Sequence, residues 1–542
     1  MQKNKLFLLI ADIKNDFGLA ILTGVMLGIS FPPISFNVLI FIALIPYFFL
    51  IERRETLLSI NRITYLSMFI FNLITLYWVG SWTKEADTFL MISGAVLLFF
   101  NPILFLIPST LFFISSKALG KKISLFLIPF FWLFYEYIYS ITDFRFPWLN
   151  LGNALSSNTL MIQIADIVGV YGLTLLIIYI NIFLFFLVKD FIKSKKINFL
   201  YLVLLAMFFV IMVGYGIYKR DFIQKNNSKV KFGIIQPNLN PWNKWEEGNL
   251  DIILNLYFDL SKKAIAQGAQ VLVWPETALP VYLTIGNYER ELLLIKNFLK
   301  QNNVSLIAGM PEATIYYGKE NLPEDAKPMS DTTRFYTSYN SILFFNHYDD
   351  SIKKYAKQKL VPFGEKVPLV DYIPFLGDLI KWNVGISSWN TGKDTTIFNL
   401  QLNDKNKINI GGVICIESIY SDYVAQFVNK GAEILVIVTN DSWYGNSSGP
   451  YQHKEYASLR AVENRKYILR CANGGISCII NPLGNTIKQT KMFEKDFIVA
   501  SVYANNYQTF FSKHPLLFPM ISVLISILVV LIYIIQKFTK KV

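Results

Sequence analysis

Long apolar runs fill the first 220 residues of the chain and return at its end. Most of them approach the roughly 20 residues that a membrane-spanning helix needs. The first seven lie at about 17–31, 36–51, 64–83, 88–116, 122–141, 168–188 and 198–218, and an eighth lies at about 515–536. The pattern predicts a polytopic α-helical membrane protein with about eight transmembrane helices.

Prolines mark two places where this pattern departs from simple spans. The first two runs are short and are separated by Phe31, Pro32 and Pro33, so they form either two spans or one re-entrant hairpin. The fourth run contains Pro102 and Pro108, which predict a kinked or tilted helix.

The pattern changes between about Val230 and Asn505. Short β-rich runs (VKFGIIQPN, QVLVWPE, VSLIAGMPE, EILVIVTN) alternate there with helical stretches such as 249–267, 287–300 and 451–466. This alternation predicts an α+β or layered α/β domain large enough to bury its own core. We therefore expect three parts: a membrane domain over 1–220, a soluble domain over 229–505, and a final helix over 513–537.

Composition and charge agree with a membrane protein. Hydrophobic residues make up 53% of the chain and charged residues only 16%, and 45 residues are Phe. The net charge of +13 alone would suit a nucleic-acid partner. The basic residues nevertheless gather in short clusters between apolar runs, which indicates membrane topology, and we expect no nucleic-acid partner.

These basic clusters predict the orientation of the chain, because Lys and Arg in short loops mark the cytoplasmic side. They fall after alternate runs, and the loops between them are poorer in positive charge. The clusters are Arg53, Arg54 and Arg62; Lys117, Lys121 and Lys122; Lys189, Lys193, Lys195 and Lys196; and Lys537, Lys540 and Lys541. Both termini are expected inside, with the soluble domain tethered at both ends on the outer face.

Cysteines and histidines are few. Three of each are spread along the chain without the spacing of a metal site, so we expect neither a metal nor a cofactor. An odd number of cysteines leaves at least one free thiol. Cys471 and Cys478 flank the turn signal NGG and form either a disulfide or two buried thiols.

Three ionisable residues follow strand-like runs, where side chains at strand ends can converge. They are Glu276, Lys357 and Cys415. A carboxylate can take a thiol proton, an ammonium can stabilise thiolate and oxyanion, and a thiolate can attack an acyl carbon. Each residue also has a plainer interpretation: a helix cap, a solvated lysine and a small buried hydrophobe. The combination favours acyl-transfer chemistry.

Four motifs in this order carry a family resemblance: WPETALP, KQKLVPFGEKVP, GGVICIES and TNDSWYGNSSGPYQH. They resemble the carbon-nitrogen hydrolase (nitrilase) superfamily with its Glu-Lys-Cys triad. With the surrounding helices, nearly the whole chain resembles the bacterial apolipoprotein N-acyltransferases. The resemblance implies an αββα sandwich for the soluble domain.

The resemblance also implies roles for single residues. Glu276 would be the general base, Lys357 the oxyanion and thiolate stabiliser, and Cys415 the nucleophile. The family pattern places the catalytic lysine eight residues before the Glu of LVPFGE, here Glu365, which selects Lys357 over Lys359.

Three further residues match supporting positions of the family. Glu365 resembles a second essential acid, and Glu417 follows the cysteine by two residues. Both are either essential acids or carboxylates that only orient Lys357. Trp245 matches a tryptophan on a loop over the site, although a packing role fits it nearly as well.

The reaction that the resemblance implies is acyl transfer from a membrane phospholipid, with phosphatidylethanolamine the usual donor, through a Cys thioester. The acceptor is the α-amino group of the diacylglyceryl-cysteine at a lipoprotein N-terminus. Such an N-acyltransferase is expected in the bacterial inner membrane, with its catalytic domain periplasmic, as a monomer.

Two alternatives remain open at this point. A membrane-tethered amidase of the nitrilase type, hydrolysing a small C–N substrate, would need the same triad. A transporter or receptor is disfavoured because mid-helix charges are few. The apolar stretch 371–389, between Lys357 and Cys415, is predicted to be an interfacial lid, or else a buried part of the domain core.

Overall fold

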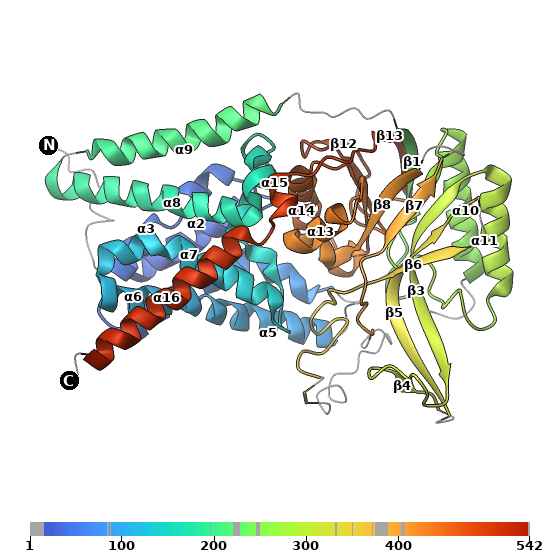
Figure 1. Ribbon diagram of the computed structural model, residues 1–542, viewed down its shortest axis with the longest axis horizontal. Coiled ribbons are helices and arrows are strands. Elements are labelled where there is room, and N and C mark those ends of the chain that lie inside the picture. Colours follow the sequence, from blue (N-terminus) through green and yellow to red (C-terminus); the bar gives the residue numbers. More distant parts are fainter. Residues whose placement is uncertain are drawn as a thin grey trace. The chain divides into compact units, whose positions relative to one another are not determined.

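The computed structural model describes residues 16–83, 86, 88–195, 197–220, 228–244, 250–330, 333–348, 351–370, 372–373, 389–402 and 407–539. The chain divides into two compact units (Figure 1). One comprises 1–80, 91–221 and 514–542, and the other comprises 81–90 and 222–513. Residues 514–542, which include most of the predicted final helix, belong to the first unit.

The first unit is helical. Its α-helices are α2 (Asp16–Ser30), α3 (Ile45–Glu52), α4 (Leu57–Leu76), α5 (Thr88–Leu104), α6 (Leu106–Leu119), α7 (Lys121–Ile141), α8 (Ala165–Ser194), α9 (Phe199–Tyr218) and α16 (Leu517–Thr539). Short 3-10 helices connect them: η2 (Asn37–Phe41), η3 (Tyr77–Gly80), η4 (Pro147–Leu149), η5 (Leu151–Leu155) and η6 (Met161–Ile164).

Six helical segments of the described chain are long and apolar enough to cross a membrane. They are Leu57–Gly80, Leu90–Leu119, Lys121–Ile141, Met161–Ser194, Phe199–Tyr218 and Leu517–Thr539. The first two predicted runs form the shorter apolar helices Asp16–Ser30 and Asn37–Glu52. The expected count of about eight is thus approximate: it comprises six long apolar helices and two shorter ones.

The predicted break in the fourth run is present. The run divides into α5 and α6 on either side of Phe105, with Pro102 inside α5. Proline removes a backbone donor and crowds the preceding turn, which accounts for the break. A second break, which the sequence pattern did not indicate, lies in α8 at Gly169, where φ is 63°.

Ion pairs join several basic residues to acidic residues of neighbouring helices within the first unit. The pairs are Arg53 and Arg54 with Asp16, Lys121 with Glu55, and Lys189 with Glu52. They connect the start of α2, the end of α3, the start of α7 and the last part of α8. Three of the predicted basic clusters therefore lie at one end of the helical unit.

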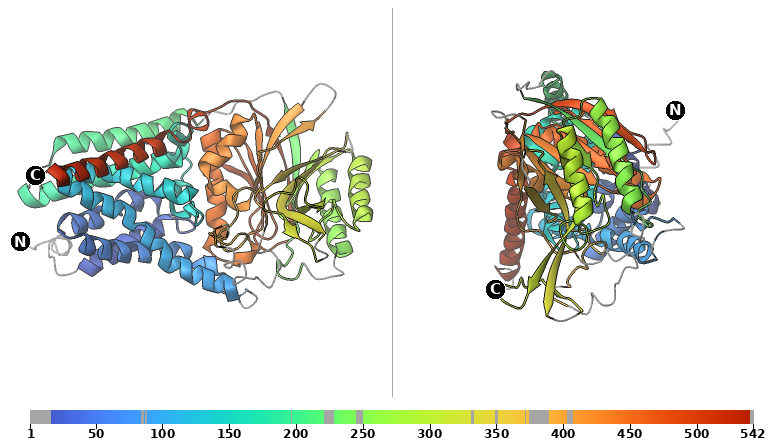
Figure 2. Two further views of the ribbon diagram at one scale, coloured as in Figure 1. Left: turned by 60° about the horizontal axis from the view of Figure 1, so that its bottom comes forward. Right: turned by 90° about the vertical axis from the view of Figure 1, so that its right-hand side faces the viewer.

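The second unit contains two β-sheets (Figure 2). In its described residues the seven-stranded sheet has the order β13-β1-β2-β3-β5-β4, with β6 also paired to β5. Its strands are β1 (Lys229–Gln236), β2 (Val271–Trp274), β3 (Ser305–Tyr317), β4 (Lys327–Pro328), β5 (Arg334–Phe345), β6 (Ile352–Ala356) and β13 (Asp496–Tyr503).

The six-stranded sheet has the order β12-β11-β10-β9-β8-β7. Its strands are β7 (Ile397–Gln401), β8 (Lys407–Ile414), β9 (Ile434–Thr439), β10 (Ile468–Ala472), β11 (Cys478–Ile480) and β12 (Thr486–Gln489). Each sheet has three neighbouring parallel strands, β1-β2-β3 and β8-β9-β10. Their residues are almost all buried, as is typical of parallel strands covered on both faces.

Helices cover the outer face of each sheet. The helices are α10 (Leu250–Ala266) and α11 (Glu289–Asn302) for the first sheet, and α13 (Ser421–Asn429) and α14 (Ser448–Asn464) for the second. The inner faces meet where β1 and β2 contact β10, and where β5 contacts β8. The four layers form the predicted αββα sandwich, and the short α15 (Phe510–Lys513) ends this unit.

The parallel strands direct their carboxyl ends to one edge of the sandwich. β2 leads directly to Pro275 and Glu276, and β8 leads directly to Cys415 at the start of η7 (Cys415–Ile419). A side chain at Gly309 of β3 would collide with this edge, because its Cβ would lie 2.5 Å from Glu276 Cα. Glycine is therefore needed at position 309 for the backbone of Glu276 to lie against β3.

We expect Gly309→Ala to destabilise the second unit. The new methyl group would press on the backbone of Glu276, and such overpacking costs about 1–3 kcal/mol. Thermal unfolding in detergent should show a melting temperature several degrees lower. Gly214→Ala is the matched control, because no atom lies within 4 Å of the added Cβ. Equal melting temperatures for the two variants would contradict this packing.

Candidate active site

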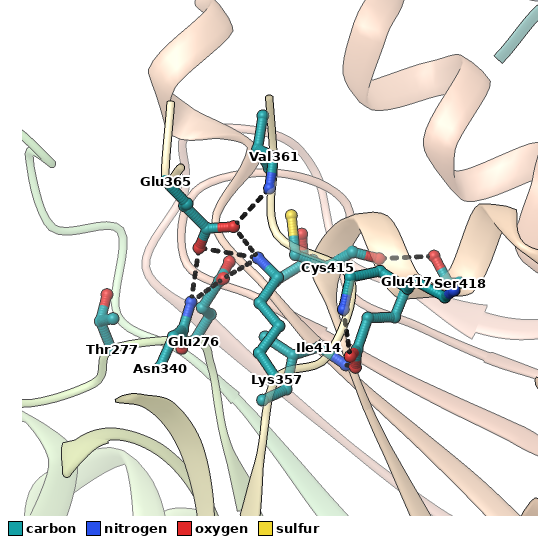
Figure 3. A network of polar contacts seen from close by, with 12 residues as sticks. Glu276, Thr277, Asn340, Lys357, Val361, Glu365, Ile414, Cys415, Glu417 and Ser418 are labelled. Atoms are coloured by element: carbon teal, nitrogen blue, oxygen red, sulfur yellow. Dashed lines mark hydrogen bonds and ion pairs between the residues drawn. The ribbon is translucent and has the colours of Figure 1, made fainter. Parts of the chain in front are cut away.

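The predicted triad residues come from three strand ends of the second unit. Glu276 follows β2, Lys357 follows β6 and Cys415 follows β8. Figure 3 shows their side chains converging with that of Glu365. The convergence expected from their positions after strand-like runs is therefore present.

Lys357 is the centre of the polar cluster. Its ammonium lies 3.2 Å from Glu276 Oε1 and 2.8 Å from the Glu365 carboxylate, and the residue is only 1% exposed. Burial alone would lower the pKa of Lys357, but Glu365 and Glu276 hold that pKa well above its ordinary value. Lys357 is therefore a permanent positive charge at this site.

The structure distinguishes Lys357 from Lys359. The ammonium of Lys359 lies over the rings of Tyr420 and Tyr423, at 5.5 and 5.6 Å from their centroids. Lys357 instead binds both carboxylates, those of Glu276 and Glu365.

Asn340 joins the two carboxylates from a third direction. Its amide nitrogen donates to Glu276 Oε1 at 2.7 Å and to Glu365 Oε1 at 2.9 Å (Figure 3). Glu365 also accepts from the Val361 N–H at 2.9 Å. The sequence analysis missed Asn340, although an Asn inside the apolar strand β5 was a usable signal, because buried amides need partners.

Cys415 has an unusual backbone and a protonated thiol. Its φ is +49°, in the left-handed region that non-glycine residues rarely adopt. Burial raises the pKa of the thiol above its usual range, the charge of Glu276 raises it further, and Lys357 opposes both. The resting site therefore holds a neutral thiol beside a carboxylate and an ammonium, so a base has to remove its proton during attack.

Glu417 binds mainly the backbone around the site. Its carboxylate accepts from the N–H groups of Gln358 at 2.6 Å and Ile414 at 2.9 Å, and from the Tyr355 hydroxyl at 2.7 Å. It thereby ties the segment after Lys357 to the strand end that carries Cys415. This arrangement favours the orienting role over direct contact with substrate.

The expected loop tryptophan, Trp245, lies outside the described residues, as does most of the predicted lid 371–389. Lys244, immediately before Trp245, is buried and donates to Thr277 O at 2.9 Å and Oγ1 at 2.6 Å. Burial lowers the pKa of Lys244 to about 8, and Glu276 opposes that shift. A second lysine thus lies beside Glu276, and the sequence analysis did not single it out.

The remaining cysteines lie in the interior of the sandwich. Cys471 and Cys478 are both buried free thiols, in agreement with the second of the two interpretations given above. The Cys471 thiol donates to the carbonyl groups of Ile235 and Val273, so it bridges the two sheets. Across the described part of the chain, no three His, Cys, Asp or Glu side chains are grouped so as to hold a metal ion.

The profiles of two known domain families match this chain. The carbon-nitrogen hydrolase profile matches residues 232–510, and the profile of the apolipoprotein N-acyltransferase N-terminal domain matches residues 23–183. Among solved structures, Saccharomyces cerevisiae Nit3, a member of branch 10 of the nitrilase superfamily, aligns with a TM-score of 0.36 and 17% identity. The alignment covers 51% of this chain and 90% of that chain.

Similar proteins named apolipoprotein N-acyltransferase occur in several bacteria. The protein of Chlorobaculum tepidum is 28% identical, over 97% of this chain and 98% of its own. That of Geobacter metallireducens is 29% identical, over 92% of each chain. That of Rickettsia typhi is 30% identical, over 88% of this chain and 90% of its own. The chain therefore belongs to the apolipoprotein N-acyltransferase family, with a carbon-nitrogen hydrolase domain over residues 232–510.

Proposed function

We propose that this enzyme transfers an acyl chain from a membrane phospholipid to the α-amino group of a lipoprotein N-terminal diacylglyceryl-cysteine. The observation that carries the proposal is the Cys415 thiol beside a lysine held by two carboxylates, in a chain of this family. The long apolar helices of the first unit suit substrates whose acyl chains stay in a bilayer.

In the first half-reaction Cys415 attacks the ester carbonyl of the donor. Glu276 takes the thiol proton, and the Lys357 ammonium stabilises the oxyanion that forms on the carbonyl oxygen. The ester C–O bond then breaks, and Glu276 returns the proton to the departing glycerol oxygen. The products are a lysophospholipid and an acyl thioester on Cys415.

In the second half-reaction the acceptor amine attacks the thioester. Glu276 takes a proton from the attacking nitrogen, Lys357 again stabilises the oxyanion, and the C–S bond breaks. The proton returns to the sulfur and restores the thiol. An amine is a good nucleophile towards a thioester and the amide product is stable, so transfer proceeds in the required direction.

Supporting residues act on this machinery in different ways. Glu365 and Asn340 fix the Lys357 ammonium and the Glu276 carboxylate, and Glu417 fixes the backbone that carries Lys357 and Cys415. We assign Trp245 to contact with the substrate on the strength of the family motif.

The partners and location follow from the same proposal. The donor is a phospholipid, with phosphatidylethanolamine our first candidate, and the enzyme acts as a monomer in the bacterial inner membrane. The ion-paired basic residues at one end of the helical unit support a cytoplasmic location for that end. Both termini then lie in the cytoplasm and the catalytic domain in the periplasm.

Product analysis tests the proposed function against hydrolysis of a small C–N substrate. With phospholipid and a diacylated lipopeptide, we expect N-acylated lipopeptide and lysophospholipid in equal amounts. Cys415→Ala should abolish both products, and Cys471→Ala, which removes a thiol outside the site, should keep them. Lipid-independent amide hydrolysis, or free fatty acid as the main Cys415-dependent product, would favour the hydrolase instead.

Removing the charge of Glu365 should change the pH dependence of acylation. Glu365→Gln takes away the carboxylate that contributes most to the raised pKa of Lys357, so that pKa falls. Neutral Lys357 cannot stabilise an oxyanion, and the alkaline limb of the acylation rate should therefore move to lower pH. Misplacement of Lys357 should also slow acylation by about 10²-fold.

The measurement is the pre-steady-state release of lysophospholipid between pH 6 and 10. Lys357 of the wild type stays charged over this range, so a loss of rate caused by its deprotonation is expected in Glu365→Gln alone. Glu320→Gln, the same substitution at an exposed position, is the control and should match the wild type. Alkaline profiles of the same shape in Glu365→Gln and the wild type would show that Glu365 does not govern the charge of Lys357.

A further inference from the structure

A second polar cluster lies behind Cys415, and the proposed reaction does not use it. Its side chains belong to five elements and are all less than 4% exposed: Ser418 in η7, Thr439 at the end of β9, Asp441 in η8 (Asp441–Tyr444), His453 in α14 and Arg470 in β10. Buried polar side chains are costly unless they are hydrogen-bonded, so their arrangement needs an explanation.

Asp441 is the hub of this cluster. Its Oδ1 lies 2.9 Å from His453 Nδ1 and accepts from the Thr439 hydroxyl at 3.1 Å, and its Oδ2 accepts from Arg470 at 2.5 Å. Burial alone would raise the pKa of Asp441, but Arg470 and His453 hold that pKa well below its usual range. Asp441 is therefore an ionised, fully bonded acceptor that fixes the direction of its neighbours.

One arm of the cluster reaches the backbone of Cys415. With Nδ1 at Asp441, the His453 ring turns its Nε2 to the Cys415 carbonyl oxygen at 3.2 Å and to the Ser418 hydroxyl at 2.8 Å. Ser418 also donates to the same carbonyl oxygen at 2.8 Å (Figure 3). When both ring nitrogens carry a proton, His453 donates from Nδ1 to Asp441 and from Nε2 to this oxygen, so that two side chains hold the carbonyl group of the nucleophile.

The other arm reaches the thiol. Ile414 of β8 pairs with Val438 of β9, so Cys415 and Thr439 lie side by side at the ends of neighbouring parallel strands. The Thr439 hydroxyl lowers the pKa of the thiol by a hydrogen bond, against the larger effect of burial. Thr439 has one hydroxyl proton, which it donates to Asp441 while the thiol is neutral. When the thiol loses its proton, the same hydroxyl can turn to the sulfur.

The backbone of Cys415 explains why such support is needed. A non-glycine residue at φ +49° is strained by about 1–3 kcal/mol and keeps that conformation only when its surroundings enforce it. The hydrogen bonds from Ser418 and His453 to the carbonyl oxygen hold the backbone of Cys415 in this conformation, and Thr439 orients the sulfur.

We propose that Asp441 positions the nucleophile through two arms, His453 on the carbonyl oxygen of Cys415 and Thr439 on its thiol. The inference rests on the proposed function in one respect, namely that Cys415 is the nucleophile. Asp441, His453 and Thr439 are positioning residues that contact no substrate.

The test uses alkylation of Cys415 by iodoacetamide as a function of pH, followed by intact mass, with acyl transfer and melting temperature measured in parallel. Five ionisable groups interact electrostatically with the Cys415 thiol: Glu276, Lys357, Asp441, Tyr444 and Arg470. All of them remain in the variants chosen here. A shift of the alkylation profile therefore measures the effect of the removed Thr439 or His453 side chain on Cys415.

For the thiol arm we compare Thr439→Val with Thr439→Ser. Loss of the hydroxyl should move the alkylation profile to higher pH and slow transfer by about 10-fold or more, because the thiolate loses a hydrogen-bond donor. Serine restores that donor and should return both readings towards wild type.

For the carbonyl arm we compare His453→Leu with His453→Gln. Leucine removes the bond to Cys415 and should slow both alkylation and transfer by about 10- to 100-fold. Glutamine carries an amide N–H near the position of Nε2 and should recover part of the loss. His347→Leu, the same change at a histidine outside the site, should have no effect on either rate.

Rates within twofold of wild type in folded Thr439→Val and His453→Leu would overturn the proposal. If His453→Leu does not fold, the two Thr439 variants and His453→Gln test the proposal in its place. Equal alkylation and transfer rates in Thr439→Val and Thr439→Ser would then overturn the proposal. The variants could change alkylation as expected while the wild-type enzyme transfers no acyl chain. That result would support the positioning of Cys415 by Asp441 and contradict the proposed function.

Discussion

The buried ammonium of Lys357 is the interaction on which the catalytic domain depends. Moving a lysine charge out of water costs several kcal/mol, and only well-placed partners offset that cost. Glu276 from the end of β2 and Glu365 from the turn after Lys357 supply them, and Asn340 in the middle of β5 holds both carboxylates. The charge is stable only when these elements are assembled, so folding and formation of the site are one event.

A second constraint concerns the nucleophile. A thiolate in this interior would be costly, and the raised pKa of Cys415 means that the resting enzyme holds a neutral thiol. The proton has to leave as the C–S bond forms, which makes the placement of Glu276 and Lys357 matter more than the equilibrium acidity of the cysteine. A protonated thiol also suits an enzyme that waits for a substrate from the bilayer.

Much of this site could be predicted from the sequence because its residues follow strands. Glu276, Lys357 and Cys415 each come directly after a strand-like run, and parallel strands end at one edge. The eight-residue spacing to Glu365 separated Lys357 from Lys359. Asn340, Lys244 and the Asp441 cluster could not be found in this way, since their roles arise from contacts between segments far apart in the chain. The exact breaks at Phe105 and Gly169 likewise depend on packing, although Pro102 indicated the first.

The most direct test of the account is to detect the covalent intermediate. Purified enzyme is incubated with phospholipid in the absence of an acceptor, and its intact mass is measured before and after addition of a diacylated lipopeptide. The account predicts one added acyl group on Cys415 that neutral hydroxylamine removes and that the lipopeptide discharges as its own N-acylation. Transfer to the lipopeptide without any acyl group ever appearing on Cys415, even when the acceptor is withheld, would contradict it.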